Sequence, residues 1–385
     1  MMKILFINNT KDFPGSAISL LNLFSGLKAR DVDIVLVGPK MESQLFLDKL
    51  QELNIRYITI NNHKNIWPKI RRGSFFQVFY SYFQWPAKMI RLLYHIVYAE
   101  RRLYDIINSF QPDIIHSNSG VIHEGIVCAK KRHIPHVIHL REYQDIDFGM
   151  KFFPSKRHFV NLLHQSYVIT ITEDILNHFD LGNYEKAKVI YNGIYPKNRI
   201  TKVWPKKKFF ICCSRISESK GHEDVIKAFA KFAAYCSDYR LKILGYGSED
   251  YILKLKVISS ELGCDKNIDW VGFVSDPFNM ISESRALIVA SRAEGFGRMT
   301  AEAAFAGTVV VGRNSGGTKE ILKKTGGILF NTVDELEAGM QKVASMTLPE
   351  YDSIIENAQS FAVNNYSNEA NVENIYNLYN CILKS

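Results

Sequence analysis

The sequence alternates short apolar segments with amphipathic ones, and it does so in two successive rounds. In the first round the apolar segments are residues 3–9, 33–38, 55–60, 113–118, 136–142 and 167–172. In the second round they are residues 209–214, 241–245, 268–273, 286–291, 309–312 and 327–330. Stretches between them, such as residues 16–30, place apolar positions at helical spacing. This alternation predicts parallel sheets covered by helices on both faces.

Length and a change of composition divide the chain. A sequence of 385 residues suits two domains better than a single core. Around residues 196–208 the alternation gives way to Pro, Lys and Asn, which is typical of a linker. We therefore predict an α/β protein of two doubly wound, Rossmann-like domains facing each other across a cleft. The expected bounds are 1–195 for the N-terminal domain, 196–206 for the linker, 207–365 for the C-terminal domain and 366–385 for a final helix, whose docking the pattern does not assign.

Composition and cysteine usage indicate the cytoplasm. The chain is 46% hydrophobic and 23% charged, and no apolar run reaches the roughly 18 residues that a spanning helix needs. The N-terminus predicts a first strand rather than a signal peptide. The six cysteines form no CxxC pair, which disfavours a zinc site or a disulfide framework. We therefore expect a cytoplasmic protein that binds no metal.

The positive charge lies in the N-terminal half. Residues 1–204 hold 27 Lys and Arg against 17 Asp and Glu, a net charge of +10, whereas residues 205–385 hold 21 against 22, a net charge of −1. Such asymmetry indicates an anionic partner for the first half, either a membrane or a nucleic acid. Because no nucleic-acid-reading module is recognisable, we expect no nucleic-acid partner.

One segment concentrates this charge together with aromatic residues. Residues 61–104 contain eight Lys or Arg, eleven aromatic residues and a single acid, Glu100. Basic residues attract anionic headgroups, and Trp and Tyr favour the interfacial layer. Pro68 and Pro86 interrupt the segment, which predicts that it lies on an anionic inner-membrane surface rather than spanning it. Two alternatives stay open: the aromatics form part of the N-terminal core, or the segment is a groove for a lipid-linked acceptor.

The stretch EGFGRMTAE carries two acids beside two glycines. Glu294 falls in a strand-to-helix loop, and Glu302 falls in the second turn of a helix expected over 298–305. Gly295 and Gly297 permit close backbone approach, and the helix start offers N–H groups to an anion. A diphosphate placed there has a carboxylate on either side to accept hydrogen bonds from sugar hydroxyls. The alternative is an N-terminal acid and an unrelated surface glutamate.

A second group of charges follows the strand at 209–214. Arg215 and Lys220 both come at the carboxyl end of this strand, beside a helix that Gly221 opens. A forked guanidinium and a point-charge ammonium suit a diphosphate leaving group. The alternative is a pair of solvated surface cations.

Together these motifs resemble family 4 glycosyltransferases of the GT-B fold. The resemblance rests on EGFGRMTAE, its continuation AFAGTVVVGRNSGGTKEIL, SRISESKG, Gly245 in LGYGS, WVGFV at 270–274, and Asn192-Gly193. It is specific across residues 207–330 and looser across residues 1–195, where PDIIHSN and the first loop are similar to the family.

The resemblance implies a role for each motif. Arg215 and Lys220 would hold the donor diphosphate, Glu294 the donor sugar and Glu302 the ribose hydroxyls. It also implies transfer with retention of anomeric configuration and without a metal, the leaving diphosphate oxygen accepting the acceptor's proton. Further donor-binding positions implied in the C-terminal half are Gly245, Phe273, Val274, Gly295, Phe296 and Gly297.

In the N-terminal half the sequence departs from the family at two places. The first loop offers Gly15 and Ser16 where many members have paired glycines, and either a phosphate contact or a plain helix cap fits them. The strand HVIHLRE places His139 and Arg141 on one face, where many members have a histidine at the strand end. Either residue suits a contact with the donor sugar, and a core role for His139 stays open.

We therefore predict a retaining, metal-independent glycosyltransferase with no cofactor. Its expected partners are a nucleotide-sugar donor and a glycan or lipid-linked acceptor, in bacterial surface polysaccharide synthesis at the inner membrane face. A nicotinamide dehydrogenase is disfavoured because neither half has a GxGxxG motif followed by an acid about 20 residues later. The alternatives are a sugar-nucleotide epimerase and a catalytically inactive binding subunit, although the latter has no need for Arg215, Lys220, Glu294 and Glu302 together.

Overall fold

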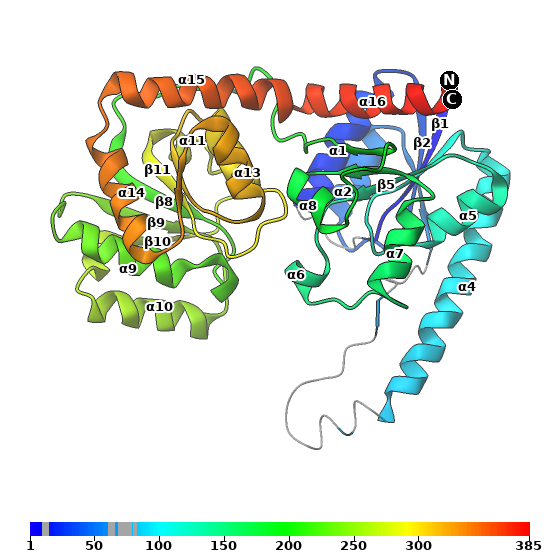
Figure 1. The fold of residues 1–385 in the computed structure, drawn as a ribbon, viewed down its shortest axis with the longest axis horizontal. Helices are drawn as coiled ribbons and strands as arrows, with labels where there is room; N and C mark the ends of the chain where they lie inside the picture. The colour runs from blue at the N-terminus through cyan, green and yellow to red at the C-terminus, as the bar shows by residue number, and fades with distance from the viewer. Residues whose placement is uncertain (10–14, 61–65, 68–78, 80–82) are drawn as a thin grey trace. The chain divides into compact units, whose positions relative to one another are not determined.

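The chain folds into two compact units, each built around one sheet (Figure 1). The computed structural model describes residues 1–9, 15–60, 66–67, 79 and 83–385. The first unit comprises Met1–Tyr191 and Asn371–Ser385, and the second comprises Asn192–Ala370. All described strand pairs in both sheets are parallel, which confirms the predicted α/β class.

The sheet of the first unit has seven strands in the order β3-β2-β1-β4-β5-β6-β7. Its strand order reverses between β1 and β4, so the loops after these two strands diverge at the carboxyl edge. The strands are β1 (Met2–Ile7), β2 (Val32–Gly38), β3 (Arg56–Thr59), β4 (Ile114–Ser117), β5 (His136–Leu140), β6 (Tyr167–Thr170) and β7 (Ala187–Val189). The helices are α1 (Gly15–Lys28), α2 (Gln44–Glu52), α4 (Trp85–Phe110), α5 (Glu124–Arg132), α6 (Asp145–Phe148), α7 (Lys156–Leu163) and α8 (Glu173–His178).

Alternating side chains of the central strand β1 enter two different cores. Ile4 and Phe6 join the cluster that α1 and α2 cover, whereas Leu5 and Ile7 join the cluster under α4 and α5. A strand that is buried on both faces reads as a continuous apolar run, which is the pattern of residues 4–7. The sheet is therefore covered on both faces, as the alternation of strands and helices predicted.

The second unit has a six-stranded sheet in the order β10-β9-β8-β11-β12-β13. The strands are β8 (Lys207–Cys213), β9 (Arg240–Leu244), β10 (Ile268–Gly272), β11 (Ser284–Val289), β12 (Val310–Arg313) and β13 (Ile328–Phe330). The helices are α9 (His222–Ala233), α10 (Glu249–Glu261), α11 (Phe278–Glu283), α12 (Arg298–Phe305), α13 (Gly316–Thr325), α14 (Val333–Ser345) and α15 (Leu348–Asn365), with short 3-10 turns at Glu218–Lys220 and Asp265–Asn267. The reversal of strand order lies between β8 and β11.

The last helix, α16 (Asn368–Lys384), packs on the first unit from Asn371 onwards. Val372, Ile375 and Tyr379 are buried in the same cluster as α1 and α2. The Asn371 side-chain amide also donates a hydrogen bond to the carbonyl of Tyr191 over 2.6 Å. The apolar stripe of this helix therefore completes the first core, a docking that sequence pattern did not assign.

The chain passes between the units at Tyr191–Asn192 and again at Ala370–Asn371. The expected linker, residues 196–206, is part of the second unit. The guanidinium of Arg199 lies over the rings of Tyr195 and Phe278, at 4.2 and 4.6 Å from their centroids. Because these contacts are internal to the second unit, the structural boundary precedes the expected one.

The expected membrane-docking segment is described only in part. Residues 61–65, 68–78 and 80–82, which include Arg71 and Arg72, lie outside the described residues. The described remainder is Ile66, Trp67, Phe79 and the chain from Phe83. In the part of the chain that the structure describes, no helix combines the length and apolar character needed to cross a bilayer.

Candidate active site

The candidate site of the second unit lies where β8 and β11 run side by side. These two strands pair in parallel, although 70 residues lie between the end of β8 and the start of β11 along the chain. The loops that follow them, residues 214–221 and 290–297, meet at the carboxyl edge, where the N–H of Arg292 donates to the carbonyl of Ser219 over 2.9 Å. In open α/β sheets this edge, at the reversal of strand order, is where ligands bind.

Lys220 and Glu294 form an ion pair between these two loops. Lys220 Nζ lies 2.7 Å from Glu294 Oε2, and each side chain is 22% exposed. Close approach of the loops depends on Gly221, which has φ 71°; a Cβ there would lie 2.3 Å from the carbonyl oxygen of Ala290. Arg215, in the same loop, is exposed. Two of the expected site residues are thus in direct contact, and a third extends from the same loop.

The Glu294 loop rests on the start of α13. The carbonyl of Glu294 accepts a hydrogen bond from the N–H of Gly317 over 2.7 Å. A Cβ on Gly316 would lie 2.4 Å from that same carbonyl oxygen, and a Cβ on Gly317 would lie 2.1 Å from the carbonyl oxygen of Phe296. Sequence analysis did not assign these two glycines, although a Gly-Gly pair at a helix start was a visible sign of close backbone approach.

We expect Gly317→Ala to destabilise the second unit by about 1–3 kcal/mol, because the added methyl group forces backbone apart rather than a flexible side chain. The measurement is urea unfolding of both proteins. Gly182→Ala is the matched control, since its Cβ would meet only the Asn177 side chain, at 3.7 Å. Unfolding of Gly317→Ala at the wild-type urea concentration would show that the loop does not rest on α13 in this way.

Helix α12 begins beside the same loop and carries Glu302. Gly297, with φ 86°, precedes the helix, so the free N–H groups of its first turn follow the loop directly. Glu302 is only 5% exposed, and its Oε1 accepts a hydrogen bond from Arg298 Nε over 2.8 Å. Burial raises the pKa of Glu302, and Arg298 lowers it in part. Arg298 was not among the predicted site residues, although its i,i+4 spacing from Glu302 on a predicted helix indicates an ion pair.

The loops after β9 and β10 lie on the other side of β8. Gly245, with φ 140°, is required because a Cβ would lie 1.9 Å from the carbonyl oxygen of Ser214. Phe273 is 70% exposed, and its ring stands edge-on to that of Tyr246 with centroids 6.0 Å apart. Val274 is half-buried. Phe273 and Tyr246 form an exposed aromatic surface beside the β8 loop, of the kind on which a flat base packs.

In the first unit, Arg141 marks the carboxyl edge. Arg141 Nε donates to the Asn118 side-chain oxygen over 2.9 Å, and its Nη2 lies 3.4 Å from His139 Nδ1. His139 is fully buried, and burial lowers its pKa well below the ordinary value. His139 is therefore neutral and lies in the core, while Arg141 is partly exposed at the edge. Gly15 and Ser16 are the first residues of α1, which follows β1.

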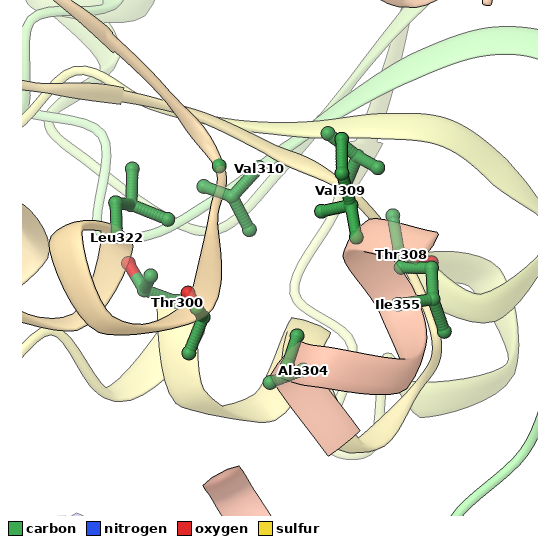
Figure 2. A pocket seen from close by; sticks show the side chains of 11 residues that line it. Thr300, Ala304, Thr308, Val309, Val310, Leu322 and Ile355 are labelled. Atoms are coloured by element: carbon green, nitrogen blue, oxygen red, sulfur yellow. The ribbon is translucent and has the colours of Figure 1, made fainter. Parts of the chain in front are cut away.

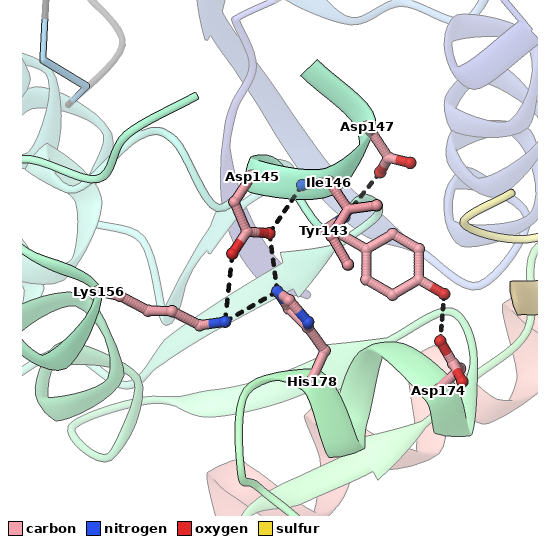
Figure 3. A network of polar contacts seen from close by, with 7 residues as sticks. All are labelled: Tyr143, Asp145, Ile146, Asp147, Lys156, Asp174 and His178. Carbon is pink, nitrogen blue, oxygen red and sulfur yellow. Dashed lines mark hydrogen bonds and ion pairs between the residues drawn. The ribbon is translucent and has the colours of Figure 1, made fainter. Parts of the chain in front are cut away.

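A polar network holds the segment after β5 in place (Figure 3). Asp145 Oδ1 lies 2.8 Å from His178 Nε2, and Asp145 Oδ2 lies 3.2 Å from Lys156 Nζ. Burial works to raise the pKa of Asp145, but His178 and Lys156 together bring it below its ordinary value. Tyr143 is hydrogen-bonded to Asp174. The network therefore ties α6 to α7 and α8.

A small cavity lies under α12 and is not a substrate site. Figure 2 shows Thr300, Ala304, Leu322 and Ile355 around it. Its volume is about 10 Å³, room for about one water molecule, whereas ligand pockets span hundreds of cubic ångströms.

Both halves of the chain match models of glycosyltransferase families. The model described as Glycosyltransferase Family 4 matches residues 14–198, and the model described as Glycosyl transferases group 1 matches residues 196–361. A curated relative is an uncharacterized glycosyltransferase of Methanocaldococcus jannaschii, 27% identical over 287 residues, which are 66% of this chain and 72% of the relative.

A second relative and a solved structure agree with these matches. The N-acetylgalactosamine-N,N'-diacetylbacillosaminyl-diphospho-undecaprenol 4-alpha-N-acetylgalactosaminyltransferase of Campylobacter jejuni is 27% identical over 145 residues, 36% of this chain and 38% of that protein. The crystal structure of HepE from Anabaena in complex with UDP has a TM-score of 0.78 at 20% identity, over 99% of this chain and 100% of that one. With both halves matched and the fold shared, the chain belongs to the family 4 glycosyltransferases of the GT-B fold.

Proposed function

We propose that this glycosyltransferase moves a sugar from a nucleoside-diphosphate donor to a glycan or lipid-linked acceptor, with retention at the anomeric carbon and without a metal ion. The observation that carries the proposal is the contact between Lys220 and Glu294 at the reversal of strand order, over 2.7 Å. It joins a cation suited to a diphosphate to a carboxylate suited to sugar hydroxyls, beside the start of α12.

Each group has a part in this scheme. The diphosphate takes Lys220 and Arg215 as counter-ions and lies at the N–H groups of the α12 start, where the chain passes through Gly295, Phe296 and Gly297. When the donor binds, the Glu294 carboxylate leaves its ion pair with Lys220 and accepts hydrogen bonds from hydroxyls of the donor sugar. Glu302 binds the ribose, and backbone groups around Phe273 and Val274 receive the base.

Retention follows if the acceptor attacks on the face that the diphosphate leaves. The acceptor oxygen bonds to the anomeric carbon while the bond from that carbon to the diphosphate oxygen breaks. The departing oxygen takes the acceptor's proton, so no second carboxylate nucleophile is required. Lys220 stabilises the charge that develops on the diphosphate in the transition state.

The Campylobacter relative suggests the class of acceptor. Its name describes transfer to a sugar carried on diphospho-undecaprenol. We place the present enzyme likewise in surface polysaccharide assembly at the cytoplasmic face of the inner membrane, with residues 61–104 on the anionic surface. The excess of +10 charges in residues 1–204 supports this placement.

Two other functions share the donor site but not the product. An epimerase would convert the donor without an acceptor, and an inactive subunit would bind the donor without turnover. A panel of nucleotide sugars, tested first by thermal stabilisation, identifies the donor, because a ligand at 100 times its Kd adds about 2.7 kcal/mol. Product analysis with that donor alone and then with lipid-linked acceptors separates the three functions.

We expect turnover to survive chelation, because Lys220 and Arg215 supply the positive charge that a metal ion would otherwise supply. The measurement is the transfer rate after EDTA treatment, compared with the same sample supplied with Mg²⁺ or Mn²⁺. Loss of activity that Mn²⁺ restores would reject metal independence.

A further inference from the structure

Helix α4 has two apolar faces, and within the part of the chain that the structure describes only one of them packs against the protein. Its buried residues are Leu92, Ala99, Leu103, Ile106, Ile107 and Phe110. The last four of these residues lie in the same cluster as Ile122 and Cys128, so this face packs on α5 and the sheet of the first unit. One apolar stripe is what a surface helix of a globular domain needs. A second stripe on the same helix therefore has another cause.

The second stripe is exposed. Ile90 is 70% exposed, Tyr94 65%, Val97 51% and Leu93 49%. At about 100° per residue, these four side chains fall within about 100° of the helix circumference, roughly opposite the buried face. Phe83, just before the helix, is 78% exposed. Figure 1 shows that the first half of α4, which carries these residues, extends beyond the sheet of its own unit.

The stripe stops in the middle of the helix. The next residues in the same arc are Arg101 and Asn108, which are exposed and polar, and Tyr104, which is half-buried and packs against the core of the first unit. The exposed side chains of this face are therefore apolar in the first half of α4 and polar in the second half. This difference indicates a contact restricted to residues 83–97, about 20 Å long at 1.5 Å per residue.

The charges around the stripe indicate what it contacts. Residues 61–99 contain no acid, and the exposed Arg91 lies along one side of the stripe. At the start of the helix the rings of Trp67 and Trp85 stack with centroids 5.6 Å apart. Cations attract anionic headgroups, and Trp and Tyr favour the bilayer interface. The combination fits a lipid surface better than an apolar protein partner.

We infer that the exposed face of α4, residues 83–97, is an interfacial element that inserts its apolar side chains into an anionic bilayer while the helix lies along the surface. Such helices bury their apolar face about 5–10 Å into the headgroup and acyl boundary. The inference deepens the proposed function. It rests on that function only for the reason that the enzyme docks, which is to reach a lipid-linked acceptor.

The test is sedimentation of the full chain with phosphatidylcholine vesicles, with and without phosphatidylglycerol. The wild type sediments with the anionic vesicles, and added salt weakens binding. The double variant Leu93→Gln/Val97→Gln lowers the partition coefficient by about tenfold or more, since two side chains leave the acyl boundary. The matched control is Leu253→Gln/Val257→Gln on α10, another exposed i,i+4 pair, at 63% and 49%. The control binds as the wild type does.

Three results would overturn the inference. They are a wild type that ignores anionic vesicles, a Leu93/Val97 variant that binds like the wild type, and equal loss in both double variants. Dimerisation of the wild type that the Leu93/Val97 variant abolishes, without vesicle binding, would assign the face to a second copy instead. Thermal stabilisation by the nucleotide sugar, measured on every variant, reports the donor site separately, so failure of the proposed function and failure of docking are distinguishable.

Discussion

We expect the replacement of Lys220 with alanine to lower kcat by about 10²–10³ at saturating donor, the loss that follows removal of one preorganised charge-stabilising group. Affinity for the donor falls less, because the demand for positive charge is greatest as the bond to the diphosphate breaks. The structure strengthens the reason. Lys220 is held within 2.7 Å of Glu294 and is only 22% exposed, so its charge is positioned before the donor arrives.

The control for this variant lies on β8, the strand that precedes the Lys220 loop. Lys207, the first residue of β8, also forms an ion pair of 2.7 Å, with Glu283, but at the opposite end of the strand. Lys207→Ala removes the same type of side chain and the same type of contact, and we expect kcat within about twofold of the wild type because exposed ion pairs contribute little. The measurement is the initial rate over a series of donor concentrations. An unchanged kcat for Lys220→Ala would remove Lys220 from the reaction.

The fold was largely predictable because strand and helix periodicity is local. All twelve expected strands are present, and α12 spans residues 298–305 as expected. Strand β7 was missed, since it has three residues at the edge of its sheet and too short a pattern to detect. The docking of α16 could not be predicted, because its apolar stripe fits either core and only tertiary packing selects one.

The sequence indicated the individual residues of the candidate site, but it did not indicate which of them contact one another. Lys220 and Glu294 were each expected at the carboxyl end of a strand, yet they are 74 residues apart. Their contact depends on β8 lying next to β11, which strand order decides and periodicity does not reveal. The pairing of Arg141 with Asn118 likewise requires β4 beside β5. The roles in donor binding stay predictions.

Glu124 gave no signal in the sequence and is the most unusual carboxyl group of the first unit. As the first residue of α5 it resembles an ordinary exposed N-terminal acid, but it is only 1% exposed. Neither carboxyl oxygen has a hydrogen-bond partner among the described residues. Burial raises the pKa of Glu124 from 4.5 to about 8; the N–H groups of Glu124 and His123, which lie near the carboxyl group without reaching hydrogen-bond geometry, offset part of this rise, and Glu100 adds to it. The group is therefore mostly protonated at neutral pH.

Glu124→Gln should stabilise the first unit by about 3 kcal/mol at pH 7. Between pH 4.5 and about 8, the unfolded chain loses the proton of Glu124 while the folded protein keeps it. Folded wild type therefore binds more protons, and its stability falls by about 1.4 kcal/mol per pH unit from this group, levelling off above the folded pKa. Glutamine keeps the shape of the neutral acid and has no proton to lose, so the variant lacks this slope.

The measurement is the difference in unfolding free energy between variant and wild type, taken from urea titrations at several pH values from 5 to 8. Labelling of the Cys128 thiol, buried one turn further along α5, reports opening of this unit alone, which matters because two units need not unfold together. Glu173→Gln, at the exposed first position of α8, is the control and should follow the wild-type slope. The pH dependence of this difference tests the raised pKa of Glu124 even if glutamine packs imperfectly, because a packing defect shifts the unfolding free energy equally at every pH. A difference that stays constant from pH 5 to 8 would mean that Glu124 is already ionised in the folded protein.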